Sequence, residues 1–374
     1  MSLPTFIAHA DWSINPEKRQ VAVAELTAEH HYRVMSLGPA QPLLTAPGDL
    51  RLGLNVAPLG PGQLWVGLDF PIGLPRAYAE QAGITFFPDF LPLIGKEPWD
   101  RFADVGATAD DVSLHRPFYP ARPGGTRQTH LYEGLGLTRQ QIRRRCDGND
   151  AESIFWTLGG KQVGKAALAG WTFLSTVPAQ AVRLWPFHGP LTKLLDGDPA
   201  AVVVSETYPR EFYQYFRTSF NGRGSKRKRE DRLDWIPDLL RWGDALEVEW
   251  QEEPRQRVES GFSEEANGED EFDAVVGLLG MISVITGVVD SGEPEDDPAV
   301  TAVEGWILGR KSDPASFSRR NATDAAWSNL AVMPQEAQRA SIEATVRRLV
   351  AFARDVGYSN DEVMALVGHC LYEV

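Results

Sequence analysis

The stretch Gln63–Pro75, with the sequence QLWVGLDFPIGLP, decides how the rest of the chain is interpreted. It begins with a short apolar run, Leu64–Leu68, which is typical of a strand covered on both faces. Asp69 follows directly, and the prolines and glycine after it stop the strand and turn the chain. A carboxylate in this place lies at the sheet edge where α/β proteins have their sites. Asp69 is therefore a candidate functional residue; the alternative is that it only caps the following turn.

Length and composition indicate an ordinary globular protein. The chain has 374 residues, of which 43% are hydrophobic and 24% are charged, which suits one large domain or two smaller ones. No apolar run reaches the roughly 18 residues of a membrane span, and the N-terminus lacks the pattern of a signal peptide. The two cysteines, Cys146 and Cys370, form neither a metal-ligand spacing nor a disulfide framework. These features predict a cytoplasmic protein with free thiols.

The charge distribution bears on nucleic-acid binding. A formal net charge of −14 argues against broad, nonspecific wrapping of nucleic acid. Two basic stretches remain as local candidates for such contacts: Arg139–Arg145, and the run Lys226, Arg227, Lys228 and Arg229. The alternative for each is a solvated loop or helix face.

The strand pattern predicts an α/β fold. Three strands joined by short turns, at 4–11, 19–26 and 31–37, predict an antiparallel meander. A helix at 47–59 and the strand at 64–69 complete a β-β-β-α-β order. Strand signals resume at two places further along, 182–187 and 200–206; the second contains three consecutive valines and ends in Glu206.

The remainder reads mostly as helix. We expect residues 1–310 to form one domain, with a large and mostly helical insert at about 76–180, and residues 311–374 to form a helical extension. A helix at 270–286 is apolar nearly all round, which indicates burial against the sheet. Other helices are expected at 75–82, 98–104, 138–145, 161–176, 210–216, 233–246, 335–356 and 359–372, and a last short strand at 304–308.

Four carboxylates occupy equivalent places: Asp11, Asp69 and Glu206 each end a strand, and Asp273 lies in the first turn of the buried helix. If the three strands are parallel neighbours, their acids converge on one edge of the sheet. Clustered carboxylates need a counter-charge, and hard oxygen ligands suit Mg²⁺ or Mn²⁺. Such ions activate a water and stabilise the leaving oxygen of a phosphodiester. The pattern therefore predicts metal-assisted phosphoryl chemistry. For Asp273 and its neighbour Asp270, the alternative is stabilisation by the helix dipole.

The order of elements and acids resembles the ribonuclease H-like superfamily, and more narrowly the DUF429 family, whose members are regarded as predicted nucleases. The matching stretches run in order from about residue 5 to 310: Ala10–Ser13, Gly67–Pro75, Gln162–Ala166, Val204–Pro209, Phe272–Ala274 and Glu304–Ile307. The resemblance implies a mixed five-stranded sheet in the order 3-2-1-4-5 flanked by helices. By the same resemblance, Asp11, Asp69, Glu206 and Asp273 are catalytic and metal-binding residues.

Three details near these motifs leave alternatives open. Relatives usually have Gly-Ile-Asp in the first strand, whereas this chain has a bulkier His9 before Ala10 and Asp11. His9 is either a partner of Asp11 or a structural histidine. Lys165 either neutralises the acids or a phosphate, as a further catalytic residue, or only extends along the start of its helix. Gly159–Lys161 lacks the spacing of a phosphate-binding loop.

Three functions follow from this reading. The first is a metal-dependent nuclease that holds nucleic acid through Lys226, Arg227, Lys228 and Arg229. The second is a non-catalytic module that binds nucleic acid or protein and retains the ribonuclease H-like fold. The third, phosphotransfer from a nucleotide, ranks last because the turn after Asp11 has no glycine-rich phosphate loop.

Overall fold

The computed structural model describes residues 3–40, 62–148, 151–158, 163–216, 224–264, 267–294 and 297–311, which all fall in one compact unit spanning residues 1–315. The helices expected at 47–59, 335–356 and 359–372 lie outside the described residues, as does Gly159–Lys161.

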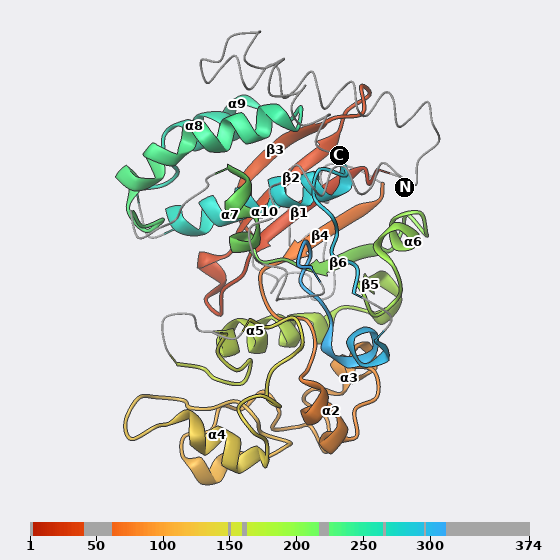
Figure 1. The fold of residues 1–374 in the computed structure, drawn as a ribbon, viewed down its shortest axis with the longest axis vertical. Coiled ribbons are helices and arrows are strands. Elements are labelled where there is room, and N and C mark those ends of the chain that lie inside the picture. The colour runs from red at the N-terminus through yellow and green to blue at the C-terminus, as the bar shows by residue number, and fades with distance from the viewer. Residues whose placement is uncertain are drawn as a thin grey trace, which may run out of the picture. The chain divides into compact units, whose positions relative to one another are not determined.

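A mixed sheet flanked by helices forms the centre of this unit, so the predicted α/β class is confirmed (Figure 1). The described strands are β1 (Phe6–Asp11), β2 (Gln20–Leu26), β3 (Tyr32–Pro39), β4 (Leu64–Leu68), β5 (Val182–Leu184), β6 (Val202–Glu206) and β7 (Glu249–Trp250). The first three strands form the expected antiparallel meander. β4 pairs in parallel with β1 on one side and with β6 on the other. The carboxyl ends of β1, β4 and β6 therefore meet at one edge.

The strand count and order differ from the expected five strands in the order 3-2-1-4-5. Seven strands follow the order β5-β6-β4-β1-β2-β3-β7, so β6 rather than β5 lies beside β4. The additional edge strands β5 and β7 have only three and two residues, too few to carry a periodic signal. The strand expected at 304–308 is reduced to a single bridge between Glu206 and Ile307.

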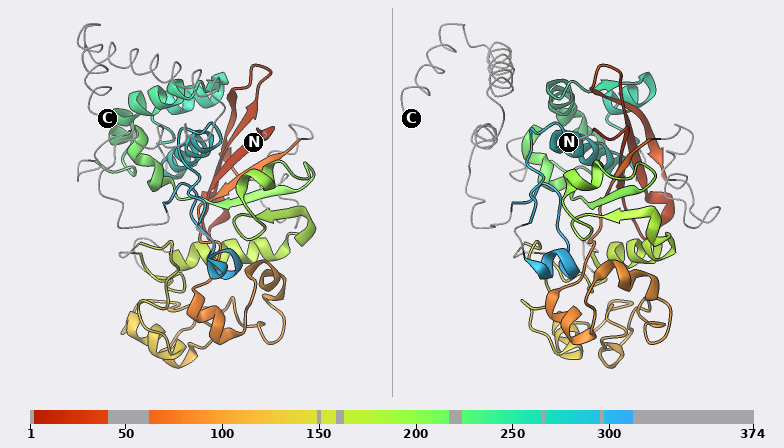
Figure 2. Two further views of the ribbon diagram at one scale, coloured as in Figure 1. Left: turned by 45° about the vertical axis from the view of Figure 1, so that its right-hand side comes forward. Right: turned by 90° about the vertical axis from the view of Figure 1, so that its right-hand side faces the viewer.

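One face of the sheet is covered by helices α7 (Pro209–Phe216), α8 (Arg229–Ala245), α9 (Glu252–Glu259) and α10 (Gly268–Ile285), as Figure 2 shows. Every residue of α10 from Glu271 to Ile285 is buried. Its all-round apolar sequence fits this place, because the sheet covers one side and α7 and α8 the other. Glu271, a buried acid in its first turn, pairs with Arg257 of α9 at 2.7 Å.

The insert lies beyond the carboxyl ends of β1, β4 and β6 in Figure 1, and its apolar side chains share one core cluster with residues on the other face of the sheet. Its helices are α2 (Arg76–Ala82), α3 (Phe87–Phe90), α4 (Gln128–Leu135) and α5 (Val163–Thr176), and α6 (Leu191–Leu195) follows β5. Short 3₁₀ turns lie at Pro16–Lys18, Leu91–Leu93, Ala109–Asp111 and Ala179–Ala181, and a π turn at Val300–Glu304. The helices expected at 98–104 and 138–145 are turns instead. Aromatic contacts such as Phe90–Trp99 and Phe102–Phe118 hold the first of these two stretches in place.

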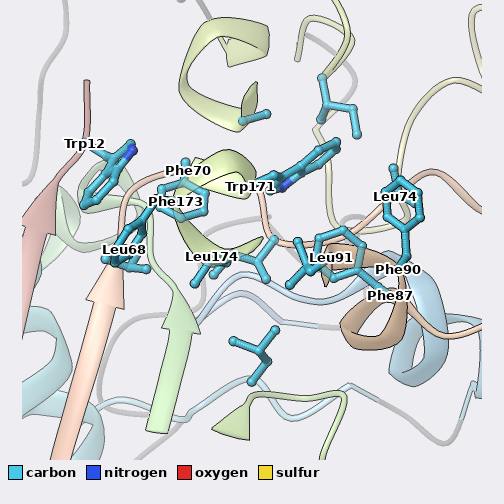
Figure 3. Packing of buried hydrophobic residues seen from close by; sticks show 14 of the residues in the cluster. Trp12, Leu68, Phe70, Leu74, Phe87, Phe90, Leu91, Trp171, Phe173 and Leu174 are labelled. Carbon is cyan, nitrogen blue, oxygen red and sulfur yellow. The ribbon is translucent and has the colours of Figure 1, made fainter. Parts of the chain in front are cut away.

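Aromatic side chains fix the chain just beyond β1 and β4. Trp12 lies 5.4 Å from Phe70 and 4.9 Å from Phe173 between ring centroids, and Figure 3 shows the three rings together. The indole of Trp171 donates a hydrogen bond of 2.6 Å to the carbonyl of Pro71. α5 therefore holds the segment that follows Asp69, which keeps the end of β4 in a defined position.

Candidate functional site

Asp11 and Asp69 lie side by side at the ends of β1 and β4. The parallel register pairs Ala10 with Leu68, and the amide of Asp69 donates to the carbonyl of Ala10 at 3.1 Å. Successive side chains of a strand alternate between its faces, so Asp11 shares the face of Ile7, and Asp69 shares that of Trp65. Ile7 and Trp65 both pack in the core beneath α10. The two carboxyl groups therefore lie on the α10 side of the sheet.

α10 brings Asp273 to the same place. Gly277 packs directly on the ring of His9, where an added Cβ atom would lie 2.2 Å from the imidazole. Asp273 lies one helical turn before Gly277, about 6 Å along the helix. Asp11 lies two residues beyond His9, about 7 Å along the strand. Since the helix and the strand run in opposite directions, these two offsets bring Asp273 next to Asp11. Asp273 is 4% exposed and Asp11 is 9% exposed.

Asp11, Asp69 and Asp270 have raised pKa values. Burial raises the pKa of Asp11 well above its usual range, and repulsion from Asp273, Asp69 and Asp270 adds to this. Burial and repulsion from Asp273 raise the pKa of Asp69 to about 8, although Lys226 and a hydrogen bond with Asp11 act in the opposite direction. The pKa of Asp270 is raised to about 6, mainly by burial and by Glu269. Ionising all of these groups would place more negative charge in the site than its surroundings balance, so the folded protein keeps protons on it.

Two donors converge on Asp273. The hydroxyl of Tyr213, from α7, donates to Oδ1, and the ammonium of Lys226 donates to Oδ2. Burial lowers the pKa of Lys226, but the attraction of Asp273, Asp11 and Asp69 outweighs it and leaves the pKa raised. Burial and the charge of Asp273 raise the pKa of the Tyr213 phenol well above its usual range, so the phenol stays neutral. Lys226 is thus the counter-charge of the acid cluster, by which we mean Asp11, Asp69 and Asp273.

Glu206 ends its strand at the same edge but faces the other side of the sheet. It pairs in register with Leu68, whose side chain packs in the core beneath the insert. Both of its oxygens accept hydrogen bonds from the buried Arg144, at 2.6 and 2.7 Å, and Oε2 also accepts one from the amide of Ile72 at 2.7 Å. Glu206 therefore belongs to an ion pair that ties the insert to the segment after β4. The predicted meeting of four carboxylates is reduced to three.

Lys165 lies apart from the acid cluster. α5 contacts the site region through Phe173, which packs on Trp12, and Lys165 lies eight residues earlier, about 12 Å along the helix. Among the described residues no ion pair joins Lys165 to a carboxylate. Lys226 provides the positive charge that Lys165 was a candidate to provide.

His9 makes no hydrogen bond to Asp11 among the described residues, so the structure does not show the partnership that was one of its two alternatives. It is fully buried between Gly67 and Gly277. Burial lowers its pKa to about 3, against the effect of the Ala274 backbone, so the ring is neutral. A neutral imidazole gives no counter-charge to the acids beside it.

The sequence did not identify Tyr213 or Thr207 as residues of the site, and it did not predict that Lys226 pairs with Asp273. Thr207 follows Glu206 and thus lies on the face of Asp69, and it is 1% exposed. Its hydroxyl has no hydrogen-bond partner within the described residues. The alternation along β6 was the signal that could have favoured Thr207 over Glu206, but a strand buried on both faces does not reveal which face is which.

Some side chains of both basic stretches are already engaged in ion pairs within the protein. In the second stretch Arg227 pairs with Glu269 at 3.3 Å and Arg229 with Glu264 at 3.2 Å. In the first stretch Arg144 is buried, and Arg145 pairs with Asp297 at 3.2 Å. Nucleic-acid binding through Lys226, Arg227, Lys228 and Arg229 stays a prediction.

The donor atoms of the acid cluster fit a hard divalent cation in chemistry, because all are carboxylate oxygens in excess over positive charge. In the part of the chain that the structure describes, no group of three His, Cys, Asp or Glu side chains has an arrangement that could hold a metal ion. The ammonium of Lys226 holds Oδ2 of Asp273 instead. A metal at this place would require that Lys226 release Asp273.

Comparisons with family models, with curated proteins and with solved structures found no match to this chain. Among the described residues no helix is long and apolar enough to cross a membrane.

The raised pKa values predict how stability changes with pH. Between about pH 4 and pH 8 the folded protein keeps the proton of Asp69 that the unfolded chain releases, so the free energy of unfolding falls as the pH rises. Asp69→Asn removes this carboxyl. We expect the free energy of unfolding at pH 8 to rise by about 1–3 kcal/mol, and to rise less at pH 5. Urea unfolding at both pH values measures the difference.

The control is Asp100→Asn, which makes the same charge change on an exposed residue. We expect this variant to alter the free energy of unfolding by less than about 0.5 kcal/mol at either pH. A loss of stability in Asp69→Asn at pH 8, or an equal gain at both pH values, would contradict the reading of mutual repulsion.

Proposed function

We propose that this chain is a metal-dependent hydrolase of phosphodiester bonds in nucleic acid, built on a ribonuclease H-like sheet as in the DUF429 family. The observation that carries the proposal is the acid cluster: Asp11, Asp69 and Asp273 meet on one face of the sheet, and Lys226 alone could not balance them if all three were ionised. The antiparallel meander followed by a parallel β4 supports the choice of fold.

The residues have distinct parts in this proposal. Asp11, Asp69 and Asp273 would hold Mg²⁺ or Mn²⁺, which supplies an activated water and charge stabilisation for phosphodiester cleavage. Tyr213 keeps Asp273 oriented through its hydrogen bond to Oδ1. Glu206 affects the site only indirectly. It accepts a hydrogen bond from the amide of Ile72 and so holds the segment that follows Asp69.

Cleavage of labelled single- and double-stranded DNA and RNA tests the proposal. We expect products with the intact protein in the presence of Mg²⁺ or Mn²⁺, and none with a chelator. Asp273→Asn should abolish them, whereas Asp100→Asn, at an exposed position, should not. Products that form equally with the chelator would contradict the proposal.

A second candidate is a non-catalytic module that binds nucleic acid or protein. The observation that favours it is the pairing of Asp273 with Lys226 and of Glu206 with Arg144, which leaves fewer free acids than a cluster of four. This reading predicts no metal affinity and binding that depends on the basic run. Neutralising Lys226–Arg229 without any loss of nucleic-acid binding would exclude its nucleic-acid form.

A further inference from the structure

Lys226 is the member of the basic run that reaches the acid cluster. Its ammonium donates to Oδ2 of Asp273, and its charge also acts on Asp11 and Asp69. Its neighbours behave differently: Arg227 pairs with the peripheral Glu269, and Lys228 is exposed. One positive charge therefore serves a cluster of three carboxyl groups.

The backbone of Lys226 is held firmly, whereas its side chain is not enclosed. The buried guanidinium of Arg232 donates to the carbonyl of Lys226 at 2.6 Å and to the carbonyls of Gly261 and Ser263. The side chain of Lys226 is 37% exposed, compared with 5% for its partner Asp273. A long, half-exposed side chain on a fixed backbone can rotate to solvent without unfolding the segment that carries it.

We propose that Lys226 is a displaceable internal counter-ion, which occupies the cation position on Asp273 and which a divalent cation must displace in order to bind. The inference rests on the proposed function and adds its regulation. A divalent ion brings two charges where Lys226 brings one, so the exchange improves the balance of the three carboxyl groups. Once displaced, the ammonium would be free to contact a substrate phosphate.

Mn²⁺ titration of the whole protein by calorimetry tests this inference. Lys226→Gln removes the competing ammonium, and we expect it to bind Mn²⁺ at least about tenfold more tightly than the wild type. Lys228→Gln makes the same charge change two residues away on an exposed side chain, and it should bind within about twofold of the wild type. Lys226→Arg keeps the charge and should not bind more tightly than the wild type.

Each outcome has a separate meaning. Equal affinities of Lys226→Gln and Lys228→Gln, or weaker binding by Lys226→Gln, would overturn the inference and leave the proposed function intact, because the wild type binds. Binding by Lys226→Gln alone would support the inference in its strongest form. No binding by any of the proteins would contradict the proposed function, and the inference would fall with it. Far-ultraviolet circular dichroism checks that each variant is folded; if Lys226→Gln does not fold, Lys226→Met takes its place.

Discussion

Asp11→Asn is expected to lower the rate of metal-dependent phosphodiester cleavage by about 10³-fold, equivalent to about 4 kcal/mol in the activation free energy. Asparagine keeps the size of the side chain but removes its charge, and Asp11 lies close enough to Asp69 and Asp273 for both to raise its pKa. The variant should remain folded, since removing one carboxyl relieves repulsion within the cluster. Single-turnover cleavage with saturating Mn²⁺ measures the rate.

Glu206→Gln is the informative companion to Asp11→Asn. Both acids end a strand and look equivalent in the sequence, but Glu206 faces Arg144 on the other side of the sheet. We expect the cleavage rate of Glu206→Gln to fall by about tenfold or less, because Glu206 affects the site only by holding the segment after β4. We expect its free energy of unfolding to fall more than that of Asp11→Asn. If Asp11→Asn cleaves at the wild-type rate, or if Glu206→Gln shows the larger loss of rate, the assignment of the site to the acid cluster is wrong.

Arg144→Met is expected to lower the free energy of unfolding by about 3–5 kcal/mol. The side chain of Arg144 is 1% exposed, and it joins Glu206 at 2.6 Å to Asp147 at 2.9 Å. Methionine fills a similar volume but leaves both carboxylates buried without their counter-charge. Burial raises the pKa of Glu206 even with Arg144 beside it, which indicates how costly the unpaired charge would be. Urea unfolding at pH 7 measures the loss.

Two variants define the cause of this loss. Arg145→Met removes the neighbouring, half-exposed arginine that pairs with Asp297, and it should cost about 1 kcal/mol or less. Adding Glu206→Gln to Arg144→Met removes one of the stranded charges and should restore part of the stability. Equal losses in Arg144→Met and Arg145→Met would show that the buried ion pair is not what holds the insert to the sheet.

Sequence reasoning located the strands that carry the acids because their signal is local. Apolar runs followed by Asp11 and Asp69, and an all-apolar helix after Asp273, are each contained within one element. Once β1 and β4 are parallel neighbours, the two aspartates must meet. The register of β4 against β6 is not local, however, and it decides that Glu206 faces the insert.

The partners of the acids could not be predicted for the same reason. Lys226 and Tyr213 lie 47 and 60 residues from Asp273 along the chain, and only the packing of α7 and α8 on α10 brings them there. The insert also depends on tertiary contacts, because aromatic packing holds residues 98–104, which the sequence pattern favours as a helix, as turns.

Binding of Mn²⁺ to the wild type and to Asp11→Asn, measured by calorimetry beside Asp100→Asn, tests the central claim most directly. We expect saturable binding to the wild type and to Asp100→Asn, and binding at least about 100-fold weaker to Asp11→Asn. Equal binding by all three proteins, or no binding by either the folded wild type or Lys226→Gln, alone or with a single-stranded oligonucleotide, would contradict an acid-built metal site at this edge of the sheet.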